Sequence, residues 1–378
     1  MPAGFVPPVY PYDQLDGAKE KAATLEGGLV DLSIGTPFDP PPAAVVQAMA
    51  TSDAERGYPA SIGSAPFRAA ARAWMARRFD VELPADGLAA CVGTKEFVAT
   101  LPQWLRLRTP ARDTVLYPAV AYPTYEMGAI LAGCRAVPVP VDDQWRLDVS
   151  AIAEADAARA LCLWSNTPGN PAGGIDDLGA VAAWGRAQGV PVFSDECYAE
   201  FTWDGPARSI LGEGGAGGSA GFEGLVAVHS LSKRSNLAGA RAGFYAGDPE
   251  LIDYLSEVRK HVGMMVPGPV QAAAAVAYDD DEHVQVQRHR YRQRLEYFAG
   301  VLGRWLGIDI ALPGGGFYLW FEAPGGDAWG FTDRLAAEGG ALVSPGEFYG
   351  AAGATHVRVA MVQPLERLEL VARRLGVG

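Results

Sequence analysis

The lysine at position 233 has neighbours that suit covalent chemistry. It follows two small hydroxyl residues, Ser230 and Ser232, and stands after the apolar run 225–228, which predicts the end of a strand. A lysine amine forms a Schiff base with an aldehyde cofactor such as pyridoxal phosphate, and the two serines with Arg241 are suitable ligands for its phosphate. Ser230 and Lys233 also fit the SxxK pattern of serine acyl-enzymes, but the SDN and KTG elements of that class do not follow.

A carboxylate and a phenol come after another apolar run, 190–193. An aspartate such as Asp195, at the end of a buried parallel strand, is costly unless it is paired. Beside a pyridine ring it would keep the ring nitrogen protonated and make the ring an electron sink, and Tyr198 could reach the ring's phenolic oxygen. The alternative for Asp195 is a strand-end aspartate that caps a turn.

Two further segments offer hydrogen-bonding groups. Asn170 lies in the segment 166–171, which two prolines stiffen because proline fixes φ and restricts the residue before it. Such an asparagine can direct its amide at a ligand, although a plain proline-rich turn is the alternative. Thr94 and Lys95 stand between a predicted strand and a predicted helix, where free backbone amides bind phosphate.

Two large side chains have positions that suit a ligand. Tyr122, after a short apolar stretch, could stack its ring on a cofactor, or it could be a core tyrosine. Arg358 interrupts the apolar strand 357–360 and therefore needs a carboxylate. A substrate α-carboxylate suits its two-pronged guanidinium, and a structural salt bridge is the alternative.

Short apolar strands alternate with helical stretches from about 88 to 250, and this order predicts an α/β fold with a mostly parallel sheet covered by helices. After a long helical region at 276–306, a mixed set of elements predicts a smaller α+β domain. The predicted division is an N-terminal arm at 1–44, a large domain at 45–285 and a small domain at 286–378.

Two other segments have clear patterns. Pro66 opens an amphipathic helix that runs to Phe79. The glycine-rich segment 212–224 predicts a flexible loop. It contains a GxGxxG match. A dinucleotide site is not expected there, because no predicted strand precedes the match and no predicted helix follows it.

The composition is that of an ordinary globular protein, with 378 residues of which 49% are hydrophobic and 20% charged. The formal charge of −13 argues against a nucleic-acid or anionic-membrane partner, because both need a basic face. The cysteines at 91, 134, 162 and 197 lack metal-ligand spacing and are expected to be free, buried thiols. No signal peptide or membrane span is evident, so a cytoplasmic protein is expected.

In their order along the chain, these residues resemble the fold-type I pyridoxal-phosphate-dependent aminotransferases of class I/II, over essentially the whole sequence. The resemblance implies that Lys233 binds the cofactor and then moves the proton between the substrate α-carbon and the cofactor. It implies that Asp195 pairs with the pyridine nitrogen, while Tyr198 and Asn170 hold the phenolic oxygen. The implied phosphate ligands are Thr94, Lys95 through its backbone amide, Ser230, Ser232 and Arg241.

The same resemblance assigns the remaining residues. Tyr122 stacks on the ring, and Arg358 takes the substrate α-carboxylate with help from Asn170 and the Gly35 backbone. Tyr58, between a glycine and a proline, resembles the tyrosine that reaches the phosphate of the partner subunit. This implies a homodimer with shared active sites.

A closer resemblance is to the actinobacterial succinyldiaminopimelate transaminases, in the segments 31–37, 121–125, 194–198, 229–239 and 258–267. Those enzymes move an amino group between glutamate and N-succinyl-2-amino-6-oxopimelate on the lysine and diaminopimelate pathway. The far end of that substrate is anionic, so a second cationic contact is expected. The candidates are Arg234, Lys260 and His261, for which surface charge or helix capping is the alternative.

Three other functions share parts of this pattern. A carbon–sulfur β-lyase uses the same scaffold and lysine, and differs only in what happens after loss of the α-proton. A general aspartate or aromatic aminotransferase is a nearer alternative. An aminotransferase-like regulator would carry an N-terminal DNA-binding domain, for which the arm at 1–44 leaves no room.

Overall fold

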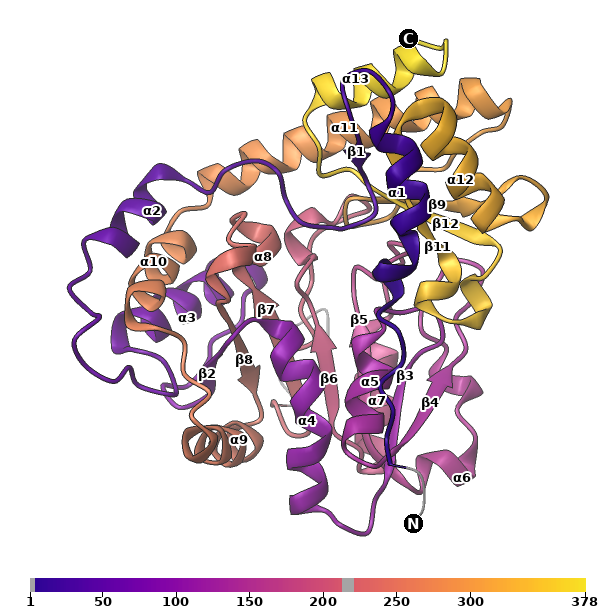
Figure 1. The fold of residues 1–378 in the computed structure, drawn as a ribbon. Helices are drawn as coiled ribbons and strands as arrows, with labels where there is room; N and C mark the ends of the chain where they lie inside the picture. Colours follow the sequence, from indigo (N-terminus) through magenta and orange to yellow (C-terminus); the bar gives the residue numbers. More distant parts are fainter. Residues whose placement is uncertain (1–3, 213–220) are drawn as a thin grey trace.

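The computed structural model describes residues 4–212 and 221–378. Its largest element is a seven-stranded sheet in the order β2-β8-β7-β6-β5-β3-β4 (Figure 1). The strands from β7 to β4 are parallel neighbours, and only β8 runs antiparallel to the strands beside it. The strands are β2 (Leu88–Cys91), β3 (Thr114–Pro118), β4 (Arg135–Val139), β5 (Ala160–Asn166), β6 (Val192–Asp195), β7 (Leu225–Ser230) and β8 (Gly243–Gly247). The predicted, mostly parallel α/β sheet is confirmed.

Helices cover both faces of this sheet, which is why every residue of β5, β6 and β7 is buried. One face packs against α4 (Thr94–Arg108), α5 (Thr124–Leu131) and α9 (Pro249–Val262). The other face packs against α3 (Ala65–Phe79), α7 (Leu178–Gln188) and α10 (Gly268–Asp279), with α2 (Ala43–Ala50) on the outside of α10.

The helix predicted to open at Pro66 is α3. Ser64 caps it, since the Ser64 side chain accepts the N–H of Phe67 at 3.4 Å. Its apolar stripe, which includes Trp74 and Phe79, is buried as its helical spacing predicts. Strand β4 was not foreseen, because it is an edge strand with partly exposed residues and a proline, Pro138.

The C-terminal part of the chain forms a smaller layer around a three-stranded antiparallel sheet in the order β11-β12-β9. This layer has a hydrophobic core of its own, which confirms the smaller α+β unit. Its elements are α11 (Glu282–Leu306), β9 (Tyr318–Glu322), α12 (Ala328–Gly339), β10 (Ala341–Leu342), β11 (Ser344–Pro345), β12 (His356–Ala360) and α13 (Leu365–Arg374).

The N-terminal segment lies against this smaller layer. Strand β1 (Val30–Asp31) pairs in parallel with β10, and α1 (Asp16–Ala23) packs on α12 (Figure 1). Helix α1 was not predicted. It is short and mostly polar, and Ala18 and Ala22 alone are buried, so it presents no apolar stripe that a sequence pattern could detect.

The helical region predicted at 276–306 is in fact two helices, α10 and α11, which meet at Asp280 and Asp281. Asp280 Oδ1 accepts the N–H of Glu282 at 2.9 Å and so caps the start of α11. The domain boundary expected between 285 and 286 falls inside α11. This helix therefore belongs to both parts of the molecule.

All four cysteines are free; Cys91 and Cys162 are buried, and the other two are half-buried. Within residues 4–212 and 221–378, no group of histidine, cysteine and acidic side chains could hold a metal ion. No helix in that part of the chain is long and apolar enough to cross a membrane. Of the loop expected at 212–224, residues 213–220 lie outside the described residues.

Candidate active site

A cavity of about 320 Å³ lies at the carboxyl ends of β5, β6 and β7, the edge where open parallel sheets bind their ligands. The large sheet, the arm and the smaller layer all contribute to its walls. The predicted residues that line it are Gly35, Thr94, Lys95, Tyr122, Asn170, Asp195, Tyr198, Ser230, Ser232, Lys233, Arg241 and Arg358.

Lys233 reaches the cavity from α8 (Leu231–Arg234), a single helical turn directly after β7. Ser230 caps this turn, because its Oγ accepts the N–H of Ser232 at 3.1 Å. The Lys233 amine donates to the carbonyl oxygen of Gly35 in the arm. Desolvation lowers the pKa of Lys233 to about 8. Much of the amine is therefore neutral and nucleophilic near that pH.

One end of the cavity gathers donors for an anion. Ser230 Oγ donates to Ser232 Oγ at 2.9 Å, and Arg241 Nη1 donates to Ser232 Oγ at 3.4 Å. Helix α4 begins beside them at Gly93, which has no side chain to cap it, so among the described residues no N-cap side chain occupies the first amides, and a ligand could bind them. Gly93 precedes this helix with φ of 74°, and a Cβ there would lie 2.2 Å from the Arg241 guanidinium. Glycine is thus required for Arg241 to approach the helix start.

Asp195 lies buried at the end of β6, away from those donors in the sequence but in the same cavity. Its Oδ2 accepts the O–H of Tyr125 at 2.9 Å, and its Oδ1 accepts the N–H of Cys197 at 3.2 Å. Burial raises the pKa of the Asp195 carboxyl. A cationic ligand group would therefore find a carboxylate that forms no ion pair with any described residue.

The segment after β5 is tied to β6 by Asn166. Its Nδ2 donates to the Asp195 carbonyl at 2.9 Å, and its Oδ1 accepts the N–H of Asn170 at 2.8 Å. Asn170 Oδ1 in turn accepts a hydrogen bond from Arg358 Nη1 at 2.9 Å. This chain of contacts fixes Asn170 between the large sheet and the smaller layer.

Arg358, on β12, is 1% exposed, and no carboxylate pairs with it in the part of the chain that the structure describes. Its guanidinium donates to Asn170, to Tyr12 Oη at 3.2 Å and to the Ser33 carbonyl, all of which are neutral acceptors. The structural salt bridge considered as an alternative is thus not found there. A buried cation without an anion is costly, and a ligand carboxylate would offset that cost.

Aromatic residues complete the cavity, and the sequence singled out Tyr122 and Tyr198 among them. The hydroxyls of Tyr198 and Tyr318 share a hydrogen bond of 2.8 Å. The lining residues that the sequence did not single out include Asn166 and the tyrosines Tyr10, Tyr12, Tyr125 and Tyr318. Tyr125 lies in the first turn of α5, three residues after Tyr122, which precedes the helix, and this closeness in sequence is the one local signal that pointed to it.

Arg234 lies outside the cavity lining, although it is adjacent to Lys233. It is 2% exposed, and its guanidinium is engaged by Glu200 at 3.2 Å and by Asp281 at 2.8 Å. Successive residues of a helical turn point about 100° apart, so the two side chains face different surroundings. This corrects the prediction that Arg234 contacts the far end of the substrate.

Lys260, His261 and Tyr58 also lie outside the cavity lining. Lys260 and His261 are exposed near the end of α9, where Lys260 pairs with Glu257 at 3.3 Å. Tyr58 is 99% exposed. None of these three side chains contributes to the cavity of its own subunit.

The family model for aminotransferase class I and II matches residues 28–375 of this chain. The chain belongs to the class I and II aminotransferases. The aminotransferase is 42% identical to a probable aminotransferase of Mycobacterium tuberculosis, over 97% of this chain and 85% of that relative. It is 41% identical to the 4-dedimethylamino-4-oxo-anhydrotetracycline transaminase of Streptomyces rimosus, over 97% of this chain and 99% of that relative. The solved structure of a probable N-succinyldiaminopimelate aminotransferase from Thermus thermophilus matches with a TM-score of 0.85 and 32% identity, and covers 96% of this chain and 98% of that one.

Enzymes of this family are transaminases that depend on pyridoxal phosphate, and the cavity suits that group. Pyridoxal phosphate carries a phosphate, an aldehyde and a pyridine nitrogen. The cavity provides Arg241 and the free amides of α4 for an anion, the Lys233 amine for an aldehyde, and the Asp195 carboxylate for a protonated ring nitrogen. The donor set thus matches the three functional groups of the cofactor.

Proposed function

We propose that this aminotransferase moves an amino group from glutamate to N-succinyl-2-amino-6-oxopimelate, as an N-succinyl-LL-2,6-diaminopimelate:2-oxoglutarate aminotransferase of lysine biosynthesis. The observation that carries amino-acid recognition is Arg358, a buried guanidinium that faces the cavity beside neutral acceptors only, within the described residues. The name of the Thermus thermophilus structure supports the particular substrate. We place the enzyme in the cytoplasm.

The proposed cofactor contacts are those that the family resemblance implies, and the lining of the cavity supports them. Asp195 pairs with the ring nitrogen, Tyr198 and Asn170 hold the phenolic oxygen, and Tyr122 covers the ring. The phosphate contacts are the hydroxyls and amides of Thr94, Lys95, Ser230 and Ser232 together with Arg241. When bound, the cofactor withdraws electrons from the substrate α-carbon, so that the α-proton becomes acidic.

Lys233 is the proposed group that takes and returns this proton. Its pKa of about 8 lies close to neutral pH, which suits a residue that must act both as base and as acid. The capped turn α8 and the contact with the Gly35 carbonyl hold the amine at the cavity. Lys233 thereby serves first as the attachment point of the cofactor and then as the base.

Replacing Arg358 by glutamine is expected to lower kcat/KM for glutamate about 100-fold, because a buried, charge-assisted contact to the α-carboxylate is lost. Stability should change little, since the substitution also removes a buried cation that has no carboxylate partner among the described residues. Steady-state kinetics and thermal unfolding measure the two effects. An unchanged kcat/KM together with a large loss of stability would show that Arg358 is a structural residue.

Lys95 is the lining cation that we propose for the far end of the substrate, in place of Arg234. Its Nζ lies 5.1 Å from the ring centroid of Tyr10 and 5.6 Å from that of Tyr122. Its hydrogen bond to Tyr10 Oη is long, at 3.4 Å, and exposed. A carboxylate would be a stronger acceptor for this ammonium group, so a second anionic group of the substrate could displace the tyrosine.

Substrate preference is tested by half-reactions that follow the absorbance of the bound cofactor. We expect glutamate and succinyl-diaminopimelate to convert the cofactor fastest, and aspartate and aromatic amino acids more slowly. Rapid conversion by aspartate or aromatic amino acids alone would favour the general aminotransferase. Pyruvate and ammonia released from cystathionine without an oxo-acid acceptor would favour the β-lyase.

The Lys95→Met variant refines this test, because it removes the ammonium group and keeps the backbone amide. Donors with a second carboxylate should react about tenfold more slowly, and donors without one should be unaffected. Lys260→Met is the matched control. The same selective loss in Lys260→Met, but not in Lys95→Met, would move the contact to Lys260 of a neighbouring subunit.

A second candidate function is amino transfer to a larger ketone. The Streptomyces rimosus relative, which is 41% identical over 97% of this chain, is named for a tetracycline intermediate. A polycyclic ketone as amino acceptor, added after glutamate has aminated the cofactor, tests this candidate in the second half-reaction. Faster turnover with that acceptor than with 2-oxoglutarate would favour it.

We also propose that the enzyme is a homodimer with shared active sites. Tyr58 is 99% exposed, which leaves its ring free to contact a second copy of the chain. The role suggested by the family resemblance, contact with the cofactor phosphate in the partner's cavity, uses such a projecting tyrosine.

A further inference from the structure

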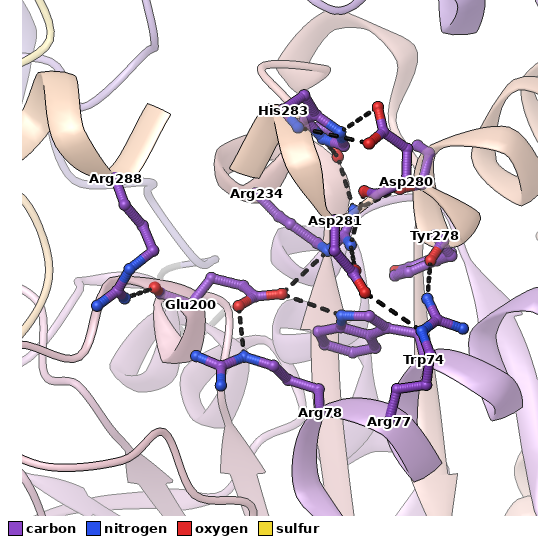
Figure 2. A network of polar contacts seen from close by, with 12 residues as sticks. Trp74, Arg77, Arg78, Glu200, Arg234, Tyr278, Asp280, Asp281, His283 and Arg288 are labelled. Carbon is purple, nitrogen blue, oxygen red and sulfur yellow. Dashed lines mark hydrogen bonds and ion pairs between the residues drawn. The ribbon is translucent and has the colours of Figure 1, made fainter. Parts of the chain in front are cut away.

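Arg234, the residue after Lys233, is hydrogen-bonded to the junction between α10 and α11 (Figure 2). Its Nη2 donates to Asp281 Oδ1 at 2.8 Å and to the Asp280 carbonyl at 3.2 Å. Its Nη1 donates to the carbonyl oxygen of Ala277. The turn that carries Lys233 is therefore held from outside by the end of one helix and the start of the next.

The two residues after Arg234 make contacts of the same kind. Ser235 Oγ shares a hydrogen bond of 2.9 Å with His283 Nε2, and Asn236 Nδ2 donates to Gln287 Oε1 at 3.2 Å. Three consecutive side chains thus contact the α10–α11 junction and the first turns of α11.

The charge of Arg234 is compensated on both sides. Its side chain is 3% exposed, and it pairs with Glu200 through Nε at 3.2 Å and with Asp281 through Nη2. The guanidinium also lies 5.3 Å from the ring of Trp74 and 5.5 Å from that of Tyr278. All three nitrogens have an acceptor. Lysine, with one compact ammonium group, could not reproduce these contacts.

Glu200 extends the same network to the segment that carries Tyr198. Its Oε1 also accepts the indole N–H of Trp74 at 3.0 Å, and its Oε2 accepts Arg78 Nε at 2.7 Å (Figure 2). Glu200 is 5% exposed. One buried ion pair, Arg234 with Glu200, therefore joins the turns on which Lys233 and Tyr198 lie.

Helix α11 connects this network to the smaller layer. Leu295, Phe298 and Leu302, further along α11, belong to the core of that layer. Arg294 of the same helix binds Asp39 in the arm through two hydrogen bonds, at 2.6 and 2.8 Å. The junction thus lies where the layer that carries Arg358 meets the turn that carries Lys233.

We propose that Arg234 is a positioning residue for Lys233, which it directs by fixing α8 to the α10–α11 junction. A single helical turn has too few internal hydrogen bonds to hold its own geometry, so its external contacts set the direction of the Lys233 side chain. The inference rests on the proposed role of Lys233. According to this inference, the orientation of the Lys233 amine depends on a residue outside the cavity.

The test compares Arg234→Lys with Arg77→Lys in the full-length enzyme. Arg77 binds the same junction, through Asp281 Oδ2 at 3.2 Å and the Tyr278 carbonyl at 2.8 Å, but it extends from α3, and in the described part of the chain no hydrogen bond or ion pair joins it to α8. We expect Arg234→Lys to lower kcat with glutamate about 10- to 100-fold, because small displacements of a reacting group have effects of this size. KM for glutamate should stay within about twofold of its original value, since the Arg358 contact is unaltered.

A second readout does not depend on turnover. When pyridoxal phosphate is added to the apo-protein, colour should return about tenfold more slowly in Arg234→Lys, because the amine is less well aimed. Arg77→Lys should keep both kcat and the rate of colour return. Asp281→Asn, which removes one ionic partner from a half-exposed position, should give a smaller fall in both rates and covers the case in which Arg234→Lys does not fold.

The outcomes separate the inference from the proposed function. A wild-type enzyme that transaminates, with equal rates in Arg234→Lys and Arg77→Lys, would overturn the positioning role. If Arg234→Lys does not fold, rates in Asp281→Asn equal to those in Arg77→Lys would overturn it as well. A wild-type protein that stays colourless and inactive with all amino donors would overturn the proposed function instead.

Discussion

Replacing Lys233 by alanine is expected to lower the rate of amino transfer about 10⁴-fold, the upper end of what a positioned acid–base group contributes. The variant loses the proposed attachment point of the cofactor and the proposed base in one step. Half-reaction rates with glutamate measure the loss of the base. Protein mass after borohydride treatment measures the loss of the attachment point, since cofactor bound to Lys233 should become irreversibly attached only in the unaltered enzyme.

Lys260→Ala is the matched control, because Lys260 is an exposed lysine outside the cavity lining. It should keep both activity and attachment. A Lys233→Ala variant that still retains cofactor after borohydride would show that another amine is used, and would contradict the assignment.

The pKa of Lys233 gives this prediction a pH dependence. The folded protein lowers it from the ordinary value to about 8, so the amine becomes neutral as the pH rises through about 8. Since the neutral amine is the nucleophile, the rate at which apo-protein recaptures pyridoxal phosphate should rise over that range and then level off. A rate that falls with rising pH would contradict this assignment.

The sequence predicts a helix or strand correctly where burial of that element requires a recognisable pattern of apolar residues. The central strands are apolar along their whole length because both faces are covered, and α3 shows its apolar stripe at helical spacing. Helix α1 and edge strand β4 have no such pattern, since they bury only part of one side. The break at Asp280 was hidden because helix formers continue on either side of it.

The residues that line the cavity could be predicted from the sequence only in part. Asp195 ends strand β6, and Lys233 and Asn170 follow β7 and β5; parallel strands bring their carboxyl ends to one edge. Tyr12 and Tyr318 complete the same cavity from the arm and from β9. Nothing local links such distant tyrosines to the strand ends, so only the folded chain reveals them.

A cationic side chain next to a reactive residue in the sequence did not predict a contact with the cavity. Arg234 was nominated because it adjoins Lys233 and is cationic, yet it is buried among Glu200, Asp281 and backbone carbonyls. Adjacency in sequence places residues on one turn, whereas contact with a ligand depends on which side of that turn they face.

The Asp195→Asn variant is expected to lower the half-reaction rate with glutamate about 10³-fold, the loss seen when a preorganised electrostatic contact is removed. Asparagine keeps the shape of the side chain, and its one oxygen can still accept the hydrogen bond that Tyr125 now gives to Asp195, although the N–H of Cys197 then loses its acceptor. It cannot supply the negative charge that would hold a pyridine nitrogen protonated. Rapid mixing with glutamate, followed by absorbance, measures the effect.

The thermal stability of the apo-protein should change little, and this distinguishes a functional carboxylate from a structural one. Burial raises the pKa of Asp195, so at pH values above that pKa the ionised group costs the apo-protein stability relative to a neutral amide. This gain opposes the loss of the Cys197 contact, so apo Asp195→Asn should unfold at a temperature close to that of the unaltered apo-protein. A large drop in the unfolding temperature with normal activity would make Asp195 a structural residue.

Asp176→Asn provides the matched control for this variant. Asp176 is also buried, and burial raises its pKa to about 6, but it accepts hydrogen bonds from the Leu147 N–H at 2.9 Å and the Ser165 hydroxyl at 2.7 Å, and it does not line the cavity. Its replacement should leave the half-reaction rate of the folded enzyme unchanged. If both variants lost activity equally, the loss would follow from disturbing a buried carboxylate near the sheet edge. Loss in Asp195→Asn alone would place the required negative charge at the end of β6, where the cavity holds no other described carboxylate.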